Sequence, residues 1–201
     1  MHFEADKISS ATAYKLLSST ILPRPIAFVT SMNASGQLNA APFSFFNAMG
    51  SAPPVVVLGF QPNADGSQKD TPNNIMETRE FVVNLVDEPL AAQMNICAAT
   101  LPADIDEVAL AKLETTPSLG VKPPRLSASP VSLECKYFSD TVLGGGGRII
   151  IGEVLHFHLR DTIVSSLNPL RIDIDALAPI SRLNGPKYGR ITDQFEIERP
   201  K

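Results

Sequence analysis

The 201-residue sequence has no tryptophan, only 3 tyrosines and only 2 cysteines. Cys97 and Cys135 lie far apart and form no CxxC pattern, which excludes a disulfide scaffold and a cysteine-based metal site. The longest apolar runs, Pro53–Phe60 and Ile149–Leu155, are far too short for a membrane-spanning helix. We therefore expect a protein of a reducing compartment that makes no contact with a membrane.

Basic charge is also scarce, because 17 Lys and Arg stand against 21 Asp and Glu, for a formal net charge of −4. Phosphate backbones require a basic stripe, so nucleic acid is excluded as the main partner. The first residues, with Glu4 and Asp6, do not resemble a secretory signal, and we expect a cytoplasmic location.

Length and composition predict a single domain that spans residues 1–201. Hydrophobic residues make up 44% and charged residues 19%, as in soluble globular proteins. The 17 prolines and 12 glycines disfavour long helices and favour short strands with many turns.

Local patterns in the first half predict alternating short elements. The expected strands and turns are Ile26–Met32, a hairpin turn at Asn33–Gly36, Gln37–Ala41, a loop over Phe43–Asn47 after Pro42 breaks the strand, Val55–Phe60 buried on both faces, and Phe81–Val86. The expected helices are Ser10 to about Ser18, one capped by Thr71 with Pro72 at its first position, Pro89–Ala98, and Asp104–Leu113 with a capping box of Asp104 and Glu107.

The second half is more openly β. Apolar and polar residues alternate over Val131–Leu143, which predicts a half-exposed antiparallel strand with Ser132 and Glu134 on its exposed side. Ile149–Leu159 predicts a second strand, joined to the first through Gly144–Gly147. Antiparallel strands with short helices at the connections predict a mainly β fold, a small closed or split barrel.

The segment from Pro25 to Ala64 contains no Asp, Glu, Lys or Arg. An uncharged stretch of this length is hard to leave fully exposed in a protein of ordinary charge. We expect it to be core in part, with the remainder covered by a partner subunit, a flat apolar ligand, or both.

Two constellations within or near this stretch could bind a ligand. Asn39–Asn47 combines neutral hydrogen-bonding groups with aromatic rings, which suits a heteroaromatic ring system; the alternative is an apolar turn that plugs a barrel end. Lys69-Asp70-Thr71 stands at a predicted helix N-terminus, which attracts anions; the alternative is an ordinary capped surface helix.

Other motifs carry less chemistry. Gly144–Gly147 is followed by a strand and not a helix, so we interpret it as a hairpin loop and not a phosphate loop. His156 and His158 share one strand face but lack a third metal ligand, and we expect them to cap the barrel or to meet a ligand's polar edge. No spacing selects a catalytic acid, base or nucleophile, and both cysteines are expected to be buried and inert.

The order of several segments resembles the flavin reductase-like family of FMN-binding split barrels, in particular its flavoredoxin-like branch. The resembling segments run from about Pro23 to about His158 and comprise Leu22–Ser31, Asn39–Asn47, Lys69–Thr71 with Asn74 and Ile75, Glu80–Asn84, Val121–Pro124 with Ser129 and Pro130, and Ile151–Val154.

This resemblance implies a Greek-key split barrel in which FMN lies at the interface of a homodimer. It implies flavin-ring and ribityl contacts from Thr30, Ser31, Ala41, Pro42, Phe43, Ser44 and Asn47. It implies phosphate contacts from Lys69, Asp70 and Thr71, with Arg24 and Tyr188 as further cofactor contacts.

The resemblance also implies an oxidoreductase that transfers electrons from NAD(P)H through FMN to free flavin, a small acceptor or another protein. An electron-transfer flavoprotein that does not itself oxidise nicotinamide is the first alternative, because no glycine-rich dinucleotide fingerprint is present. A ligand-binding barrel without a redox role is the second. No residue is assigned as catalytic and no metal is expected.

Overall fold

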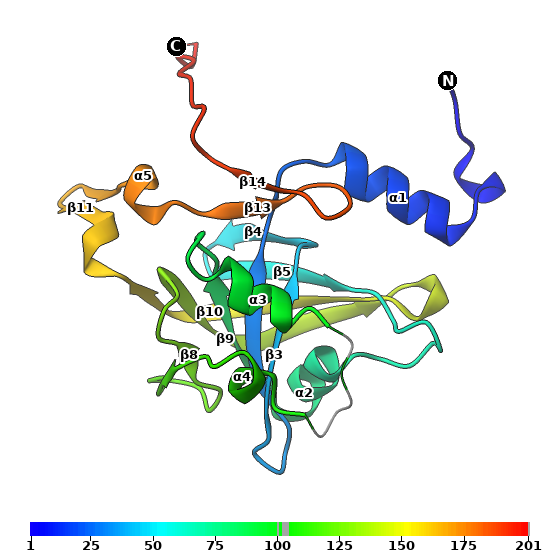
Figure 1. Cartoon of the computed structure of the whole chain (residues 1–201), viewed down its shortest axis with the longest axis horizontal. Helices are drawn as coiled ribbons and strands as arrows, with labels where there is room; N and C mark the ends of the chain where they lie inside the picture. Colours follow the sequence, from blue (N-terminus) through cyan, green and yellow to red (C-terminus); the bar gives the residue numbers. More distant parts are fainter. Residues whose placement is uncertain (100, 102–104, 201) are drawn as a thin grey trace.

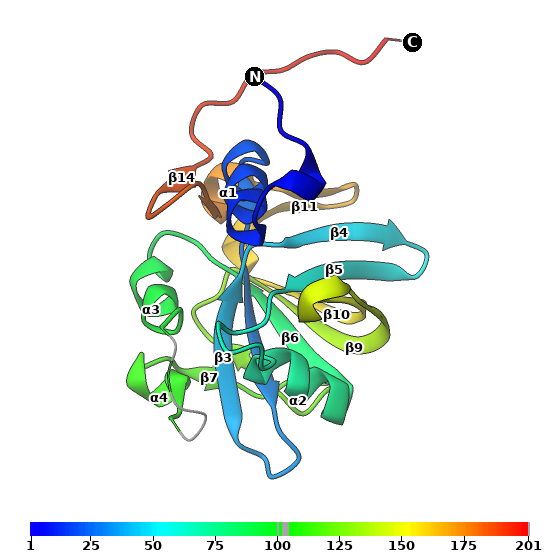
Figure 2. The ribbon, with the colours of Figure 1, turned by 90° about the vertical axis from the view of Figure 1, so that its right-hand side faces the viewer.

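A curved antiparallel sheet of seven strands dominates the computed structural model, which describes residues 1–99, 101 and 105–200. Along the sheet the strands are β3 (Leu38–Phe43), β2 (Ala27–Met32), β6 (Glu80–Leu85), β9 (Val131–Val142), β10 (Arg148–Leu159), β5 (Pro54–Phe60) and β4 (Phe46–Ser51). Figures 1 and 2 show this sheet curling on itself, with the helices at its periphery. The predicted mainly β split barrel is confirmed.

Smaller elements surround the sheet. The helices are α1 (Ser10–Thr20), α2 (Asp70–Thr78), α3 (Ala91–Ile96), α4 (Glu107–Leu110) and α5 (Ile174–Leu177). The short strands are β1 (Arg24–Pro25) with β13 (Ile180–Arg182) and β14 (Tyr188–Arg190), β7 (Thr115–Thr116) with β8 (Arg125–Leu126), and β11 (Val164–Leu167) with β12 (Leu170–Ile172). No helix among the described residues is long and apolar enough to cross a bilayer.

Strand β2 is buried on both faces and separates two apolar cores. Ile26, which precedes it, and Phe28 belong to a core covered by Leu90 and Met94. Ala27 and Val29 face a second core inside the curved sheet, and the other members of that core include Val56, Leu58, Phe60, Ile75, Phe81 and Ile150. The charge-free character of β2 follows from this position, because neither face meets water.

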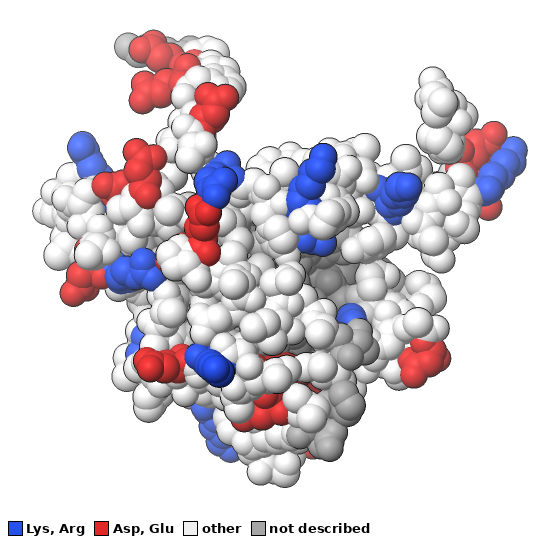
Figure 3. Space-filling model, viewed as in Figure 1, with Lys and Arg blue, Asp and Glu red and all other residues white. Residues whose placement is uncertain are grey.

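The uncharged stretch from Pro25 to Ala64 divides into three environments. Strand β2 is core, whereas β3 is half-buried and β4 is exposed from Asn47 to Ser51. Met49 on β4 exposes 62% of its surface. Figure 3 shows acidic and basic side chains interspersed on the face seen in Figure 1, with wide uncharged areas between them.

Two expected boundaries and one expected burial pattern in this stretch were wrong. Strand β3 continues through Pro42, which pairs with Phe28, because β3 lies at the sheet edge, where a missing N–H is tolerated. The expected loop over Phe43–Asn47 is only a short connection before β4 begins at Phe46. Strand β5 alternates between half-buried and buried residues, because only one of its faces packs on the core.

Helix starts also differ from the prediction. Helix α2 begins at Asp70 with Lys69 as its N-cap, so Thr71 is not the cap and Pro72 is the third helical residue. Proline fits there because the first-turn N–H groups have no partner within the helix. Helix α4 is shorter than predicted and is capped by Asp106, whose side chain accepts from Ala109 N at 3.0 Å; the expected cap, Asp104, lies outside the described residues.

The expected exposed face of β9 is also wrong, because Ser132 and Glu134 are both buried. The segment before β8 covers this face and donates backbone N–H groups to the Glu134 carboxylate, from Leu119 at 2.8 Å and Gly120 at 2.6 Å. His158 Nε2 lies 2.6 Å from the same carboxylate. The alternating pattern predicted which residues share a face, but a covering loop decided that this face is buried.

Gly152 on β10 allows the closest packing in the sheet interior. A Cβ built at this position would lie 2.8 Å from Phe81 Cε1 and 3.4 Å from Cys135 Cβ. We expect Gly152→Ala to lower the free energy of unfolding by about 1–3 kcal/mol, as overpacking of a core does. Denaturant unfolding measures the change, and Gly144→Ala is the control, since a Cβ at Gly144 meets only open space. Equal stability of the two variants would contradict this packing.

Candidate functional site

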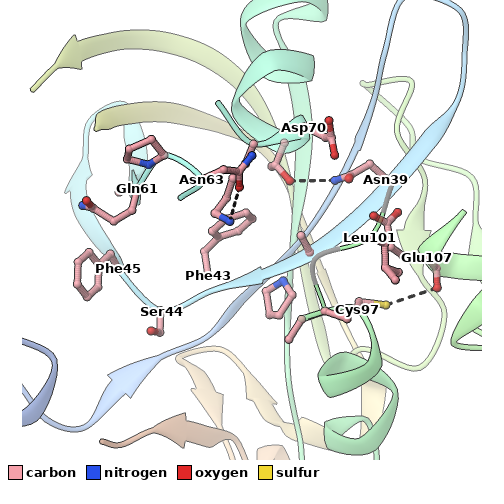
Figure 4. A pocket seen from close by; sticks show the side chains of 18 of the residues that line it. Asn39, Phe43, Ser44, Phe45, Gln61, Asn63, Asp70, Cys97, Leu101 and Glu107 are labelled. Atoms are coloured by element: carbon pink, nitrogen blue, oxygen red, sulfur yellow. Dashed lines mark hydrogen bonds between the residues drawn. The ribbon is translucent and has the colours of Figure 1, made fainter. Parts of the chain in front are cut away.

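A cavity of about 650 Å³ opens between β3, the loop from β5 to α2, and the helices α1, α3 and α4. Figure 4 shows its lining, with Gln61, Ser44 and Phe45 at one end, Asn63 between the two ends, and Glu107 at the other. These three parts of the cavity differ in chemistry, and different elements of the fold form each of them.

The first part is neutral and rich in aromatic rings. Phe43, at the end of β3, contacts Phe60 edge to face with ring centroids 4.7 Å apart. Phe45 contacts Tyr14 of α1, with centroids 5.8 Å apart. Ser44 lies between them and accepts a hydrogen bond from Arg24 Nε at 3.3 Å. Such a surface suits a flat ring system with hydrogen-bonding edges.

The central part presents cationic and hydroxyl groups at the start of α2. Lys69 Nζ donates to Asn63 Oδ1 at 3.1 Å, which orients the ammonium group along the cavity wall. Thr71 also lines the cavity, and its hydroxyl accepts from Asn39 Nδ2 at 2.9 Å. The positive end of the α2 dipole adds to the charge of Lys69, so this part of the cavity attracts an anion.

The third part is acidic and contains a thiol. Burial raises the pKa of the Glu107 carboxyl, and the nearby carboxylates of Asp70 and Asp106 raise it further. Burial also raises the pKa of Cys97 to about 12, with Glu107 and Asp106 adding to the shift. The thiol is therefore protonated and unreactive, as predicted, and burial raises the pKa of Cys135 as well.

Seven of the residues predicted to contact a cofactor line this one cavity. They are Ala41, Pro42, Phe43, Ser44, Lys69, Asp70 and Thr71. They come from β3, the connection after it and the N-terminus of α2, which are distant in sequence. Their convergence is a finding of the structure, whereas their contacts to a cofactor stay a prediction.

The other five lie outside the lining. Thr30 is fully buried and donates to Pro124 O at 2.6 Å, and Ser31 is fully buried and accepts from Asn74 Nδ2 at 3.2 Å. Asn47 is exposed on β4, where its Oδ1 accepts from Ala48 N. Tyr188 is exposed on β14, and its hydroxyl donates to Asn95 Oδ1 at 3.4 Å.

Arg24 is the fifth of these residues, and it holds three segments together. Its guanidinium donates to the backbone oxygens of Ser18 and Ile21 at the end of α1, and to Leu183 O in the C-terminal segment. Its fourth bond reaches Ser44, which lines the cavity. Burial lowers the pKa of Arg24, yet each of its three side-chain nitrogens donates to at least one acceptor.

Sequence reasoning missed several lining residues. Asn63 belongs to a loop and Tyr14 to a surface helix, and no motif marks them, whereas Glu107 was singled out only as a member of a capping box. His156 and His158, singled out as a pair, do not line the cavity, and their rings lie 6.3 Å apart. The described residues include no group of three or more His, Cys, Asp or Glu placed to hold a metal ion.

The raised pKa of Glu107 predicts a pH-dependent stability. A carboxyl whose pKa is higher in the folded than in the unfolded state stabilises the fold when protonated, and this contribution is lost as pH rises through the folded-state pKa. We expect Glu107→Gln to flatten the fall in unfolding free energy from acidic to neutral pH, measured by urea titration. The exposed Glu114→Gln is the control, and identical pH profiles for wild type and Glu107→Gln would contradict the prediction.

Comparisons with known proteins show the family of this chain. The family model described as flavin reductase like domain matches residues 18–171. BH2278 of Halalkalibacterium halodurans is 38% identical over 205 residues, covering 100% of this chain and 97% of the relative.

Two solved structures are similar over nearly the whole chain. Nitrilotriacetate monooxygenase component B from Bacillus cereus superposes with a TM-score of 0.92 at 36% identity, covering 98% of each chain. The 2-nitrobenzoate 2-nitroreductase NbaA of Pseudomonas fluorescens gives 0.90 at 34% identity, covering 100% of this chain and 96% of the other. The chain therefore belongs to the flavin reductase-like family.

Proposed function

We propose that this protein binds FMN in the cavity described above and transfers electrons from NAD(P)H through the flavin to free flavin or another acceptor. The observation that carries the proposal is the junction of a neutral, aromatic strand end with an anion-attracting helix start in one cavity. FMN has the same two parts, a flat ring system and a phosphate. The proposal covers residues 1–201 as one unit, and the two free, buried cysteines suit a reducing cytoplasm.

The donor set of the cavity fits this coenzyme. Lys69 and Thr71 would hold the phosphate, together with the first backbone N–H groups of α2. The backbone of β3 from Ala41 to Phe43, with Ser44, would lie along the ring and ribityl chain. Bound FMN would supply the redox chemistry, while these residues position it and exclude water from its face.

The named relatives support an oxidoreductase and suggest two classes of acceptor. One similar structure is a component of a monooxygenase, and the other is a nitroreductase. A reductase that feeds reduced flavin to a partner and a reductase that acts on a small aromatic acceptor are both consistent with these relatives. An electron carrier that does not oxidise nicotinamide is the second candidate, favoured by the lack of a glycine-rich dinucleotide motif in the sequence.

A partner subunit belongs to the proposal as well. Strand β4 is at the end of the sheet order, uncharged and exposed, whereas soluble proteins usually protect such an edge with charges or proline. A second copy of the chain would cover this surface and complete a homodimer.

The anion site can be tested by removing its two side chains. Lys69→Ala combined with Thr71→Ala is expected to weaken FMN binding by a few kcal/mol in total, at about 1.5–3 kcal/mol per charge-assisted bond. Fluorescence titration measures the affinity, and riboflavin is the matched control because it lacks the phosphate. Unchanged FMN affinity would contradict this assignment and would mean that the phosphate binds at another place.

The electron donor can be tested by rapid mixing. We expect the flavin absorbance of the FMN-loaded protein to bleach when NADH or NADPH is added without oxygen, as followed by stopped flow. If neither nucleotide bleached the flavin but dithionite did, the reductase hypothesis would be rejected in favour of the electron carrier. If the purified protein neither contained nor bound flavin, both redox hypotheses would fail, and the ligand-binding barrel without a redox role would remain.

The dimer can be tested at β4. We expect the wild-type protein to sediment as a dimer at micromolar concentration and Met49→Asp to shift it toward the monomer, because a charge would be buried at the interface. Leu119→Asp, at an exposed leucine away from β4, is the control. A wild-type monomer would contradict the proposed subunit contact.

A further inference from the structure

The run Gly144–Gly147, which joins β9 to β10, is the sequence feature that the proposed function does not use. Gly145 and Gly146 have φ values of +79° and +84°, a left-handed conformation that favours glycine. Leu143 N donates to Gly147 O at 2.7 Å and closes the turn. None of the four glycines is among the residues that line the cavity.

This turn lies against the loop that leads from β5 to α2. Gln68 Nε2 donates to Gly146 O at 2.7 Å. A Cβ built on Gly146 would lie 3.8 Å from Pro62 Cγ and 3.9 Å from Gln68 Nε2. The backbone of the turn is therefore in contact range of residues at both ends of the loop.

The same loop carries the groups that face the anion-attracting part of the cavity. Asn63 N donates to Ser67 O at 2.8 Å, and Asn63 Nδ2 donates to Ser67 Oγ at 3.1 Å, so the loop is folded on itself. Asn63 Oδ1 accepts from Lys69 Nζ at 3.1 Å. Gln68 directly precedes Lys69, so a contact that fixes Gln68 also restricts the backbone from which the lysine side chain extends.

The start of β10, directly after the glycine turn, adds a second contact, to the helix that follows Lys69 in the chain. Arg148, the first residue of β10, forms an ion pair with Asp140 of β9. Its Nη1 also lies 3.6 Å from Met76 Sδ on α2. The hairpin thus contacts both the loop before Lys69 and the helix after it.

We propose that the glycine turn is a support for the anion-binding loop, holding Lys69 at the cavity through Gln68 and so raising affinity for the phosphate end of the ligand. The ligand part of this inference rests on the proposed function. Gln68 and Gly146 are positioning residues, because neither Gly146 nor Gln68 lines the cavity. Glycine suits the turn because the left-handed backbone brings the Gly146 carbonyl to Gln68.

The test compares Gln68→Ala and Gly146→Ala with the control Gly144→Ala, which adds a Cβ in open space at a residue without a positive φ. Losing one hydrogen bond of ordinary strength corresponds to a loss of affinity of about fivefold. We expect both variants to bind FMN about fivefold more weakly, with riboflavin affinity unchanged and with Gly144→Ala indistinguishable from wild type. Unchanged FMN affinity, or an equal loss for FMN and riboflavin, would overturn the proposal.

Hydrogen exchange of the flavin-free protein separates this inference from the proposed function. We expect faster amide exchange over residues 61–69 in Gln68→Ala and Gly146→Ala, but not in Gly144→Ala. If the wild-type protein bound no flavin and exchange still rose, the proposed function would fail while the mechanical support stood. Exchange that stays at the wild-type rate in both variants would overturn the support itself, whatever the flavin result.

Discussion

A buried network of neutral hydrogen bonds between the sheet and α2 is the interaction on which the site depends. Asn39 of β3 donates to Thr71 of α2 and to Ser31 of β2, and Asn74 of α2 donates to the same Ser31. All four side chains are buried, so breaking one bond would leave an unpaired polar group away from water. This network sets the distance between the neutral strand and the start of the helix, and hence between the aromatic and the anion-attracting parts of the cavity.

The network also explains why uncharged polar residues occupy these positions. A charged group at Ser31 or Thr71 would have to be desolvated inside the fold, which costs far more than burying a hydroxyl. Small hydroxyl and amide groups pair with one another at close range. These hydrogen bonds fix the orientation of the Asn39 and Thr71 side chains in the cavity wall. The positive charge is supplied separately by Lys69, at the surface end of the same helix turn.

Arg24 extends this organisation to the outer side of the cavity. It joins the end of α1, the C-terminal segment near Leu183, and Ser44 on the cavity wall. The Arg24 side chain thus links two segments that are more than a hundred residues apart in sequence, and it links both of them to the cavity wall. The acidic part at Glu107 lies on the short helix α4, which is anchored through the buried Val108, and partial burial raises the pKa of the Glu107 carboxyl.

Local patterns in the sequence were sufficient to locate six strands of the sheet along the chain, namely β2, β3, β5, β6, β9 and β10, and the two segments whose residues meet in the cavity. They did not predict strand β4, nor that β2 rather than β5 is buried on both faces. Alternation and turn residues act over a few neighbours, so they carry this information directly. They predicted Lys69 and Thr71 as an anion site but placed the helix cap two residues too late, at Thr71, since Lys69 is the N-cap. The short strands β11 to β14 escaped prediction, because segments of three or four residues leave too little periodicity.

What only the tertiary structure decided is how distant segments cover one another. The loop at Gly120 buries Glu134, the edge position of β3 tolerates Pro42, and the glycine turn meets Gln68 across 78 positions of the chain. The same holds for Thr30 and Ser31, whose hydroxyls point into the fold and away from the cavity lining. Each of these outcomes depends on which surface a remote segment lies against, and a residue's own neighbours in sequence do not specify that surface.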